Sequence, residues 1–487
     1  MEEEGSSPYN FTDTISHSRF STLTECIQLY PKGQTDDTVG QSKIIRFVLP
    51  NNRFLAVYFS NSDGLQATVS LLQKKPNEDE WSACTEASAS NLAINALSIY
   101  CAFHEIYLAR NDIRVVDFES GYKQAQRLMF NPIYAHIGQK LQGKIIFEEN
   151  DPLAYIAMLK SDFKMGSNLM KELFKTSFTS TAGDGQFTFR LQPFSFPFFQ
   201  RSVDRTQNKA FILSEDPSSS NELSIVCNLR HSDSNALFSY RKSPNDNTQY
   251  KFEVKQLSLL LRVVVFTPAI RNTLISQPIV KYPRIRHEIF QKSVPDSSQI
   301  ISVDMPNVQI PSHIVIFAVK KKLLNESRTL EALTDANRYD TFIPLKPTSI
   351  NVKYNEYSLF RQDMSPWRFY SKQNKLYLYE NFLKGIGITC DELTNEKMNF
   401  ATFIDPEKLS FPVISLNLSA DLISGVPSLP LGMSEESLKS NQNLSYTMQI
   451  ENYEVTDDLT IITVLSYNTI LHYNVIQHHV EREEIVY

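Results

Sequence analysis

Residues Lys251 to Phe266 read KFEVKQLSLLLRVVVF, an unusually long run of residues that favour β-structure. Valine, isoleucine and phenylalanine pack well on the pleated surface of a sheet. From Leu257 onward the run is almost continuously apolar instead of alternating, which is typical of a strand buried on both faces. We therefore expect this segment to be a central strand of a packed sheet.

Shorter runs of the same kind lie on both sides of this segment, with turn residues between them. The earlier ones are KIIRFVLP (43–50), FLAVYFS (54–60), LQATVSLLQ (65–73), INALSIYCAFHEIYLA (94–109), FTFRLQPFSFPFF (187–199) and ELSIVCNLR (222–230). The later ones are RHEIFQKSV (286–294), SQIISVDM (298–305), SHIVIFAVKKK (312–322), TSINVKYNEYSLF (348–360), FPVISLNLS (411–419), LSYTMQIENY (444–453) and DLTIITVLSYNTILHYN (458–474). Many short strands separated by turns predict a β-sandwich or barrel-like architecture.

Helical patterns interrupt the strands in a few places. Apolar residues three and four apart between residues 117 and 174 predict two or three short helices in a long excursion, and Asp151 suits a helix cap there. The segment 325–340 and a patch at 379–386 also favour helix.

With 487 residues, the chain is too long for one ordinary core. Two stretches of similar length each open with strands, carry a decorated middle and close with long strands. We predict a flexible N-terminal arm at 1–41, a first β-domain at 42–270 with a helical insertion at about 117–180, and a second β-domain at 271–487, with the join near 267–275.

The formal net charge of −6 gives the whole chain no electrostatic reason to bind nucleic acid. Lys281, Arg284 and Arg286 form the basic run that stands out. They could make a small patch facing a nucleic acid, or simply a solvated strand end, which is the commoner situation.

The five cysteines are Cys26, Cys84, Cys101, Cys227 and Cys390. They are odd in number, far apart and without CxxC spacing, so we expect reduced thiols of a cytoplasmic or nuclear protein, with no disulfide framework or zinc site. The acidic start MEEEGSSPYN predicts no secretory signal. The apolar run 257–266 is broken by Arg262 and too short to span a bilayer.

Signatures of chemistry are missing from the sequence. The chain has only 14 glycines and neither GxGxxG nor GxxxxGK[ST], so nucleotide-binding loops are not expected. It has no GxSxG elbow and no cysteine in a catalytic context, and solvation explains the pair Asp457–Asp458. We predict a protein that is not an enzyme, with no catalytic, cofactor-binding or metal-binding residues and no cofactor.

The histidines are candidate metal ligands, because jelly-roll oxygenases bind metal through histidine side chains. The pair His478–His479 cannot chelate one ion from a regular strand, since adjacent side chains point to opposite faces. His472 could join them only through a turn. We interpret these residues as polar groups near an exposed C-terminus, and His104 as a hydrogen-bonded histidine in the core or at an interface.

Carbohydrate binding stays open as an alternative. Exposed aromatic side chains bind sugars on many jelly-rolls, and Trp81, Trp367 and several tyrosines could serve here.

The order of these segments resembles the double jelly-roll major capsid proteins of Polinton/Maverick elements and related capsid-like proteins encoded in animal genomes. The most specific block runs from Tyr250 to Val319: a long strand, a short helix, the tract KYPRIR (281–286), a further strand, and IPSHIVIFAV (310–319). FPVISLNLSADL (411–422) is similar to a family segment ending in Asp-Leu, and 460–480 is similar to its last strand. The resemblance covers roughly residue 43 to the C-terminus.

The sequence also departs from the family pattern. The family's tract GRxHxDxFxQ reads LQPFSFPFFQ (191–200) here, where only Phe198 and Gln200 fit, and a glycine usual in the second jelly-roll is replaced by a longer segment at 327–340. These changes concern contacts between subunits more than the fold.

The resemblance implies an all-β fold of two tandem jelly-rolls with helical insertions. It further implies a major capsid protein in a virion, built into pseudo-hexameric homotrimers that meet neighbouring capsomers and minor capsid or penton proteins in an icosahedral shell, with no membrane span. A minor capsid component, a host-domesticated copy and a ligand-binding jelly-roll are the alternatives.

Overall fold

The structure is a computed structural model. It describes residues 21–33, 44–50, 54–58, 64–84, 92–94, 103–119, 186–191, 211–214, 222–229, 238–240, 248–295, 299–320, 345, 347–355, 357–358, 367–368, 414–417, 441–450 and 459–485. Its strands form several antiparallel sheets, and the described helix is α7 (Pro268–Ser276).

The first half of the chain forms two main sheets. In one, β1 (Ser21–Leu29) pairs with β13 (Gln249–Phe266), β13 with β3 (Leu55–Tyr58), and β3 with β10 (Phe211–Leu213). The other has the order β2 (Ile44–Val48), β11 (Leu223–Leu229), β7 (Phe103–Arg110) and β8 (Ile113–Glu119). The first sheet is extended by β4 (Gly64–Lys74), β5 (Ser82–Ala83) and β9 (Gln186–Leu191), and β6 (Leu92–Ile94) pairs with β12 (Phe238–Tyr240).

The second half repeats this plan. One sheet has the order β14 (Ile279–Val294), β22 (Leu459–Asn474), β16 (His313–Lys320) and β20 (Ile414–Asn417), with β23 (His479–Ile485) beside β22. The other has the order β15 (Ile300–Val308), β21 (Gln442–Ile450), β17 (Pro347–Tyr354) and β18 (Tyr357–Ser358), with β19 (Trp367–Arg368) also beside β17.

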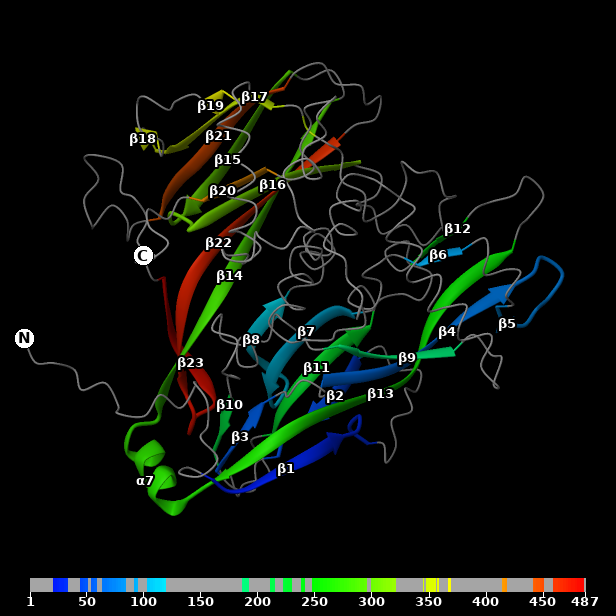
Figure 1. Cartoon of the computed structure of the whole chain (residues 1–487), viewed down its shortest axis with the longest axis vertical. Helices are drawn as coiled ribbons and strands as arrows, with labels where there is room; N and C mark the ends of the chain where they lie inside the picture. The colour runs from blue at the N-terminus through cyan, green and yellow to red at the C-terminus, as the bar shows by residue number, and fades with distance from the viewer. Residues whose placement is uncertain are drawn as a thin grey trace, which may run out of the picture.

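The two halves have the same strand order. The eight main strands are β1, β2, β3, β7, β8, β10, β11 and β13 in the first half, and β14, β15, β16, β17, β18, β20, β21 and β22 in the second. Numbered along the chain, the strands of one sheet in each half have the order first, eighth, third, sixth, and those of the other have the order second, seventh, fourth, fifth. Two four-stranded sheets with such crossing connections define a jelly-roll. The described strand pairs all fall within one half or the other, and α7 joins the halves at the foot of the molecule (Figure 1).

Alternation along the strands builds the cores. In β15, Ile301, Val303 and Met305 are buried while the residues between them are exposed. Tyr446 and Thr463 join the two sheets of the second jelly-roll through a buried contact of 2.7 Å between their hydroxyls. Along β13 the residues Leu257 to Leu259 are all buried, which confirms a strand covered on both faces at this point.

Most predicted strands are confirmed, and the all-β double jelly-roll fold with them. The structure places β1 inside the segment 1–41 that the sequence assigned to an arm, and it extends β8 to Glu119, so that 117–119 is strand where we expected helix. The other residues of the predicted helical segments at 117–180, 325–340 and 379–386 lie outside the described residues, as does Asp151.

We expect Leu465→Ala on β22 to destabilise the protein by about 2–5 kcal/mol, because Leu465 is fully buried and the substitution leaves a cavity. Urea unfolding followed by circular dichroism measures the effect. The control Ile44→Ala, at a side chain that is 52% exposed, should change the free energy of unfolding by less than about 0.5 kcal/mol. Equal effects of the two substitutions would contradict this placement of β22.

Candidate functional site at the junction of the two jelly-rolls

The edge of the first jelly-roll meets the second at β10. An edge strand carries backbone N–H groups without a partner in its sheet. Here the hydroxyl of Tyr282 on β14 accepts a hydrogen bond of 3.1 Å from the backbone N–H of Ile212. Phe211, Ile212 and Leu213 are each at most 1% exposed. The second jelly-roll thus covers an edge that would otherwise be open.

Aromatic rings fill this contact. The ring centre of Phe211 lies 5.9 Å from that of Tyr282 and 5.1 Å from that of Tyr473 on β22. Tyr282 and Tyr473 lie 6.2 Å apart in an edge-on arrangement. Tilted and edge-on pairs at these distances are favourable beyond the apolar area that they bury. The junction therefore combines apolar packing with the backbone hydrogen bond.

His478 lies in the same contact, in the turn between β22 and β23, and is 1% exposed. Its Nε2 lies 3.1 Å from Oγ of Ser214, and its Nδ1 lies 3.2 Å from the hydroxyl of Tyr473. A neutral imidazole has one donor and one acceptor nitrogen, and a hydroxyl can take either role. The ring thus connects the end of β10 to β22 across the junction.

The junction keeps its tyrosines neutral. Burial raises the pKa of Tyr282, and the hydrogen bond from Ile212 opposes this only in part. Burial also raises the pKa of Tyr473 well above its usual range, with a contribution from Tyr282. Both hydroxyls therefore act as hydrogen-bonding groups without charge.

A second connection comes from the turn between β7 and β8. Arg110 donates a hydrogen bond of 2.6 Å from Nη1 to the backbone oxygen of Gln477, beside His478. Asn111 and Asp112 follow it with positive φ angles of 47° and 70°, a conformation that asparagine and aspartate adopt more readily than most residues. The tight turn thus directs Arg110 toward the second jelly-roll.

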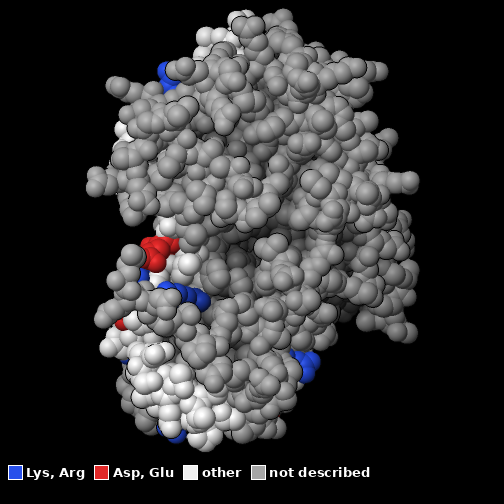
Figure 2. Space-filling view, turned by 60° about the vertical axis from the view of Figure 1, so that its left-hand side comes forward, with Lys and Arg blue, Asp and Glu red and all other residues white. Residues whose placement is uncertain are grey.

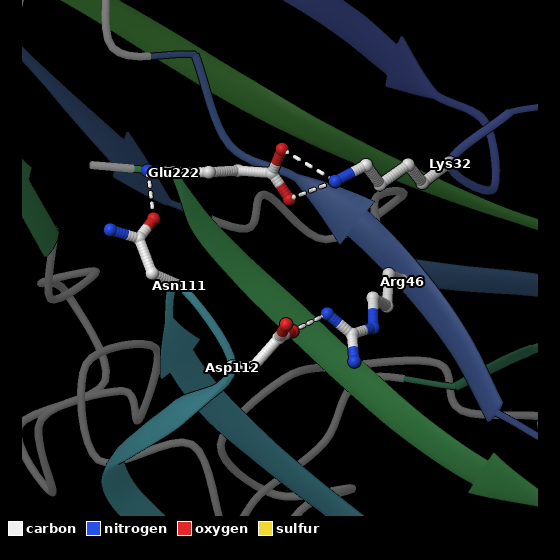
Figure 3. Close-up of polar contacts among 5 residues, drawn as sticks. All are labelled: Lys32, Arg46, Asn111, Asp112 and Glu222. Carbon is white, nitrogen blue, oxygen red and sulfur yellow. Dashed lines mark hydrogen bonds and ion pairs between the residues drawn. The ribbon is translucent and has the colours of Figure 1, made fainter. Parts of the chain in front are cut away.

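Polar contacts fix this turn to the first jelly-roll (Figure 3). Asn111 donates its backbone N–H to the oxygen of Glu222 and accepts the N–H of Glu222 at Oδ1, at 3.0 and 2.7 Å. The Glu222 carboxylate also pairs with Lys32 at 2.8 Å, and Arg46 pairs with Asp112. These groups are partly exposed, so each ion pair contributes little by itself. Together they tie the turn to β2 and to the residue that precedes β11.

On the other side of the junction, side chains attach the C-terminal strand β23 to β22. His472 Nε2 lies 2.9 Å from Oε2 of Glu484. Thr469 donates to Glu483 at 2.7 Å, and the Asn474 amide donates to Glu481 at 2.8 Å. Figure 2 shows acidic and basic side chains close together on this side and a largely uncharged described surface toward the foot. Charged residues on an edge strand also discourage unwanted strand pairing.

The arrangement of Ser214, His478 and Tyr473 has the spacing of a hydroxyl next to a base, but its position argues for a structural role. Ser214 and His478 are each 1% exposed, so a substrate has no access to either side chain. Among the described residues, no group of three or more His, Cys, Asp or Glu side chains could hold a metal ion. Nor is any helix in the described ranges long and apolar enough to cross a membrane.

The structure corrects one interpretation of the histidines. His478 is buried at the junction, whereas the sequence suggested a polar residue near an exposed end. The reason is the turn at 475–478, which folds β23 back onto β22 and carries His478 inward. His472 is also buried and contacts Glu484, and His479 opens β23.

Other residues named from the sequence are spread over the molecule. Lys281 is exposed on β14, which also contains Arg284 and Arg286, whose side chains lie outside the described part. Lys251 Nζ lies 4.8 Å above the ring of Trp81, so this ring face is occupied by a cation, and Trp367 lies on β19. Cys84 and Cys227 are buried free thiols and Cys26 is an exposed one.

Several residues named from the sequence lie outside the described part of the chain. His104 lies on β7, but its side chain is outside the described part. Cys101, Phe198, Gln200, Cys390, Asp457 and Asp458 lie outside the described residues altogether.

Sequence reasoning missed most of the junction. Tyr282 was noticed only as part of the KYPRIR tract, and its paired position on β14 carries no signal of a contact with Ile212. Phe211 opens a strand of three residues that is too short for a periodic pattern, and Ser214 follows directly after that strand. A run that is apolar on both faces, FIL at 211–213, is the one signal that could have indicated a second covered face.

Comparison with known proteins concerns the fold. No protein-family model matches the chain, and no curated protein matches it. Among solved structures, a chain in the 3.5 Å cryo-EM structure of the Sputnik virophage has 14% identity and a TM-score of 0.51, over 96% of this chain and 89% of that one. The mavirus major capsid protein has 10% identity and a TM-score of 0.45, over 94% and 90%. The Faustovirus major capsid protein has 10% identity and a TM-score of 0.42, over 92% and 90%.

Tyr282→Phe tests the hydrogen bond at the junction. The substitution removes the acceptor of the buried Ile212 N–H and keeps the ring, so we expect a loss of about 1–3 kcal/mol in the free energy of unfolding. Chemical denaturation measures it. Tyr30→Phe, at a tyrosine that is 40% exposed, is the matched control and should be nearly neutral. A neutral Tyr282→Phe would argue against this contact.

Glu484→Gln tests the attachment of β23. The hydrogen bond with His472 holds the pKa of Glu484 below its usual range, so the carboxylate stabilises the fold above the unfolded pKa of about 4.3. That contribution is lost as the pH falls through the lower folded pKa. We expect wild type to be more stable than Glu484→Gln at pH 6–7, by a small margin because the side chain is 47% exposed. In urea titrations the difference should shrink as the pH is lowered below the unfolded pKa of about 4.3. A difference that grows on acidification would contradict the assignment.

Proposed function

We propose that this protein is a structural capsid protein that forms the shell of a virion. The observation that carries the proposal is the fusion of two jelly-rolls of identical strand order into one block through a buried junction. The likeness in fold to a chain of the Sputnik virophage, over most of both chains, supports it. The described residues offer an extensive set of contacts that fix shape and no accessible constellation for chemistry.

In this proposal the chain has two domains that meet at α7, corresponding to 42–270 and 271–487, with the segment before residue 42 contributing β1 to the first. Each jelly-roll buries its inner faces and leaves loops at its ends. Two of them held side by side make a rigid building block. Rigidity is what a shell requires, because small errors in the angle between blocks add up around a closed surface.

We further propose that three blocks assemble around an axis into a homotrimer with a pseudo-hexagonal outline. Six jelly-rolls in a ring tile a curved surface, and closed trimers follow the usual symmetry of homo-oligomers. The partners would be further copies of the trimer and minor capsid or penton proteins. The virion would be the location, and the chain itself would have no enzymatic role.

Size-exclusion chromatography with light scattering tests the trimer. We expect about 168 kDa, three times the 55.9 kDa chain, and negative-stain microscopy should show three-lobed particles that form shells or sheets at higher concentration. A strict monomer at all salt concentrations and pH values would contradict the proposal.

A further inference from the structure

The outer face of the sheet β15–β21–β17 carries a regular grid of side chains. Its inner face is the core, so the alternate residues point outward. The registers place three rows across the three strands. These rows are Ile300, Gln449 and Ser349; Ser302, Thr447 and Asn351; and Asp304, Ser445 and Lys353. We call these nine residues the grid face.

The grid face is mostly polar and is open over much of its area. Ile300, Ser302, Asp304, Thr447, Gln449 and Lys353 are exposed, and the three others are partly or largely covered. Seven of the nine residues are uncharged, and most are short, so ordering them in a contact costs little side-chain entropy. The edge strand β23 differs from the grid face in this respect, because four of its seven residues are charged. The sheet lies at the end of the molecule far from α7 (Figure 1).

The two charged residues occupy symmetric positions. Asp304 and Lys353 lie in the same row, on either side of Ser445. Two strand spacings separate them, about 10 Å, so they are placed as separate charges and not as one ion pair. Ser302 and Thr447 contact at 3.4 Å, and Ser349 donates to Gln449 at 3.2 Å, which orders the uncharged rows.

This pattern is complementary to itself under one operation. A two-fold axis parallel to β21, lying between two facing grid faces, exchanges the β15 and β17 columns and keeps each row. Asp304 then faces Lys353 of the second copy, and Lys353 faces its Asp304. Thr447, on the central strand, faces Thr447 of the second copy. An axis perpendicular to the strands would exchange the rows and leave the charges without partners.

We propose that the grid face is a two-fold contact between two copies of this chain, packed sheet against sheet. Twisted sheets pack face to face with their strands within about 30° of each other, which the parallel arrangement satisfies. Three strands and three rows cover only about 300 Å² per copy. A stable dimer needs about 800 Å² per partner, so the contact is weak by itself.

A weak two-fold contact suits a shell built from trimers. A trimer closes on itself, and a second symmetry element is needed to connect one trimer to the next. The inference in this form rests on the proposed capsid function, and it assigns to the grid face the joining of neighbouring trimers. Many weak contacts act together in a complete shell and still allow a misplaced trimer to dissociate.

Charge exchange tests the proposed pairing. Asp304→Lys alone and Lys353→Asp alone each place like charges opposite each other, so we expect shell assembly, followed by light scattering and negative-stain microscopy, to need at least tenfold more protein. The double variant restores opposite charges across the axis and should assemble as wild type does. Asp79→Lys, an equal change of charge on an exposed loop, is the control. Chromatography should show intact trimers for every variant.

Single variants that assemble as well as wild type, or a double variant that stays folded and trimeric but does not recover, would overturn the proposed contact. Neither result would affect the capsid proposal, which depends on the assembly of wild type.

Cross-linking tests the axis without requiring shells. In a Cys26→Ser background, which removes the exposed thiol of the described part of the chain, Thr447→Cys treated with a short bismaleimide should give cross-linked pairs in concentrated solution. The background protein and a Ser276→Cys variant on α7 are the controls. If Thr447→Cys gives no more cross-linked pairs than these controls, the two-fold contact is wrong, whether or not wild type forms shells.

Discussion

The edge strand β10 of the first jelly-roll, which needs a cover, is the constraint on which the rest of the structure depends. β10 lies at the end of the described strand order of its sheet, and its three residues are buried because the second jelly-roll covers them. The hydroxyl of Tyr282 completes the hydrogen bonding of Ile212, and Phe211 packs on Tyr473. An unpaired buried N–H is costly. The first jelly-roll alone would expose the polar edge of β10 and the ring of Phe211, and the second alone would expose the rings of Tyr282 and Tyr473. The two jelly-rolls therefore depend on each other in a way that their separate cores do not.

Strands with several consecutive apolar residues were mostly predictable from the sequence, and polar or charged strands such as β1 and β23 were not. β13 and β22 can be recognised in the sequence by their many consecutive apolar residues. β1, with the sequence STLTECIQL, has too few apolar residues to be separated from an arm, and it becomes a strand because β13 offers it a partner. β23, HVEREEI, has four charged residues and is held by side-chain contacts to β22. The burial of His478 depends on Ser214, 264 positions earlier in the chain, which no local pattern can reveal.

The two jelly-rolls solve one geometric problem in different ways. In each, the last strand is longer than the third strand that pairs with it. β13 pairs with β3 only at residues 262–265, and β4 pairs with residues 249–260. β22 pairs with β16 at residues 459–466, and β23 pairs with residues 469–474. The first jelly-roll thus extends its last strand away from α7, whereas in the second jelly-roll the added strand lies at the end of β22 next to the junction. Because β23 pairs with this end of β22, the chain turns at 475–478, and the turn brings His478 and Gln477 to the first jelly-roll.

Strong contacts inside the block and weak contacts on its outer face belong together physically. The junction is aromatic and nearly closed to solvent, so it resists bending between the jelly-rolls. The grid face is open, polar and small. If the strengths were reversed, copies would bind one another before their own two halves had a fixed angle, and errors in curvature would be trapped. Because the angle is set within one chain, a weak contact between chains is sufficient to transmit it, and the number of such contacts in a shell supplies the stability that a single contact lacks.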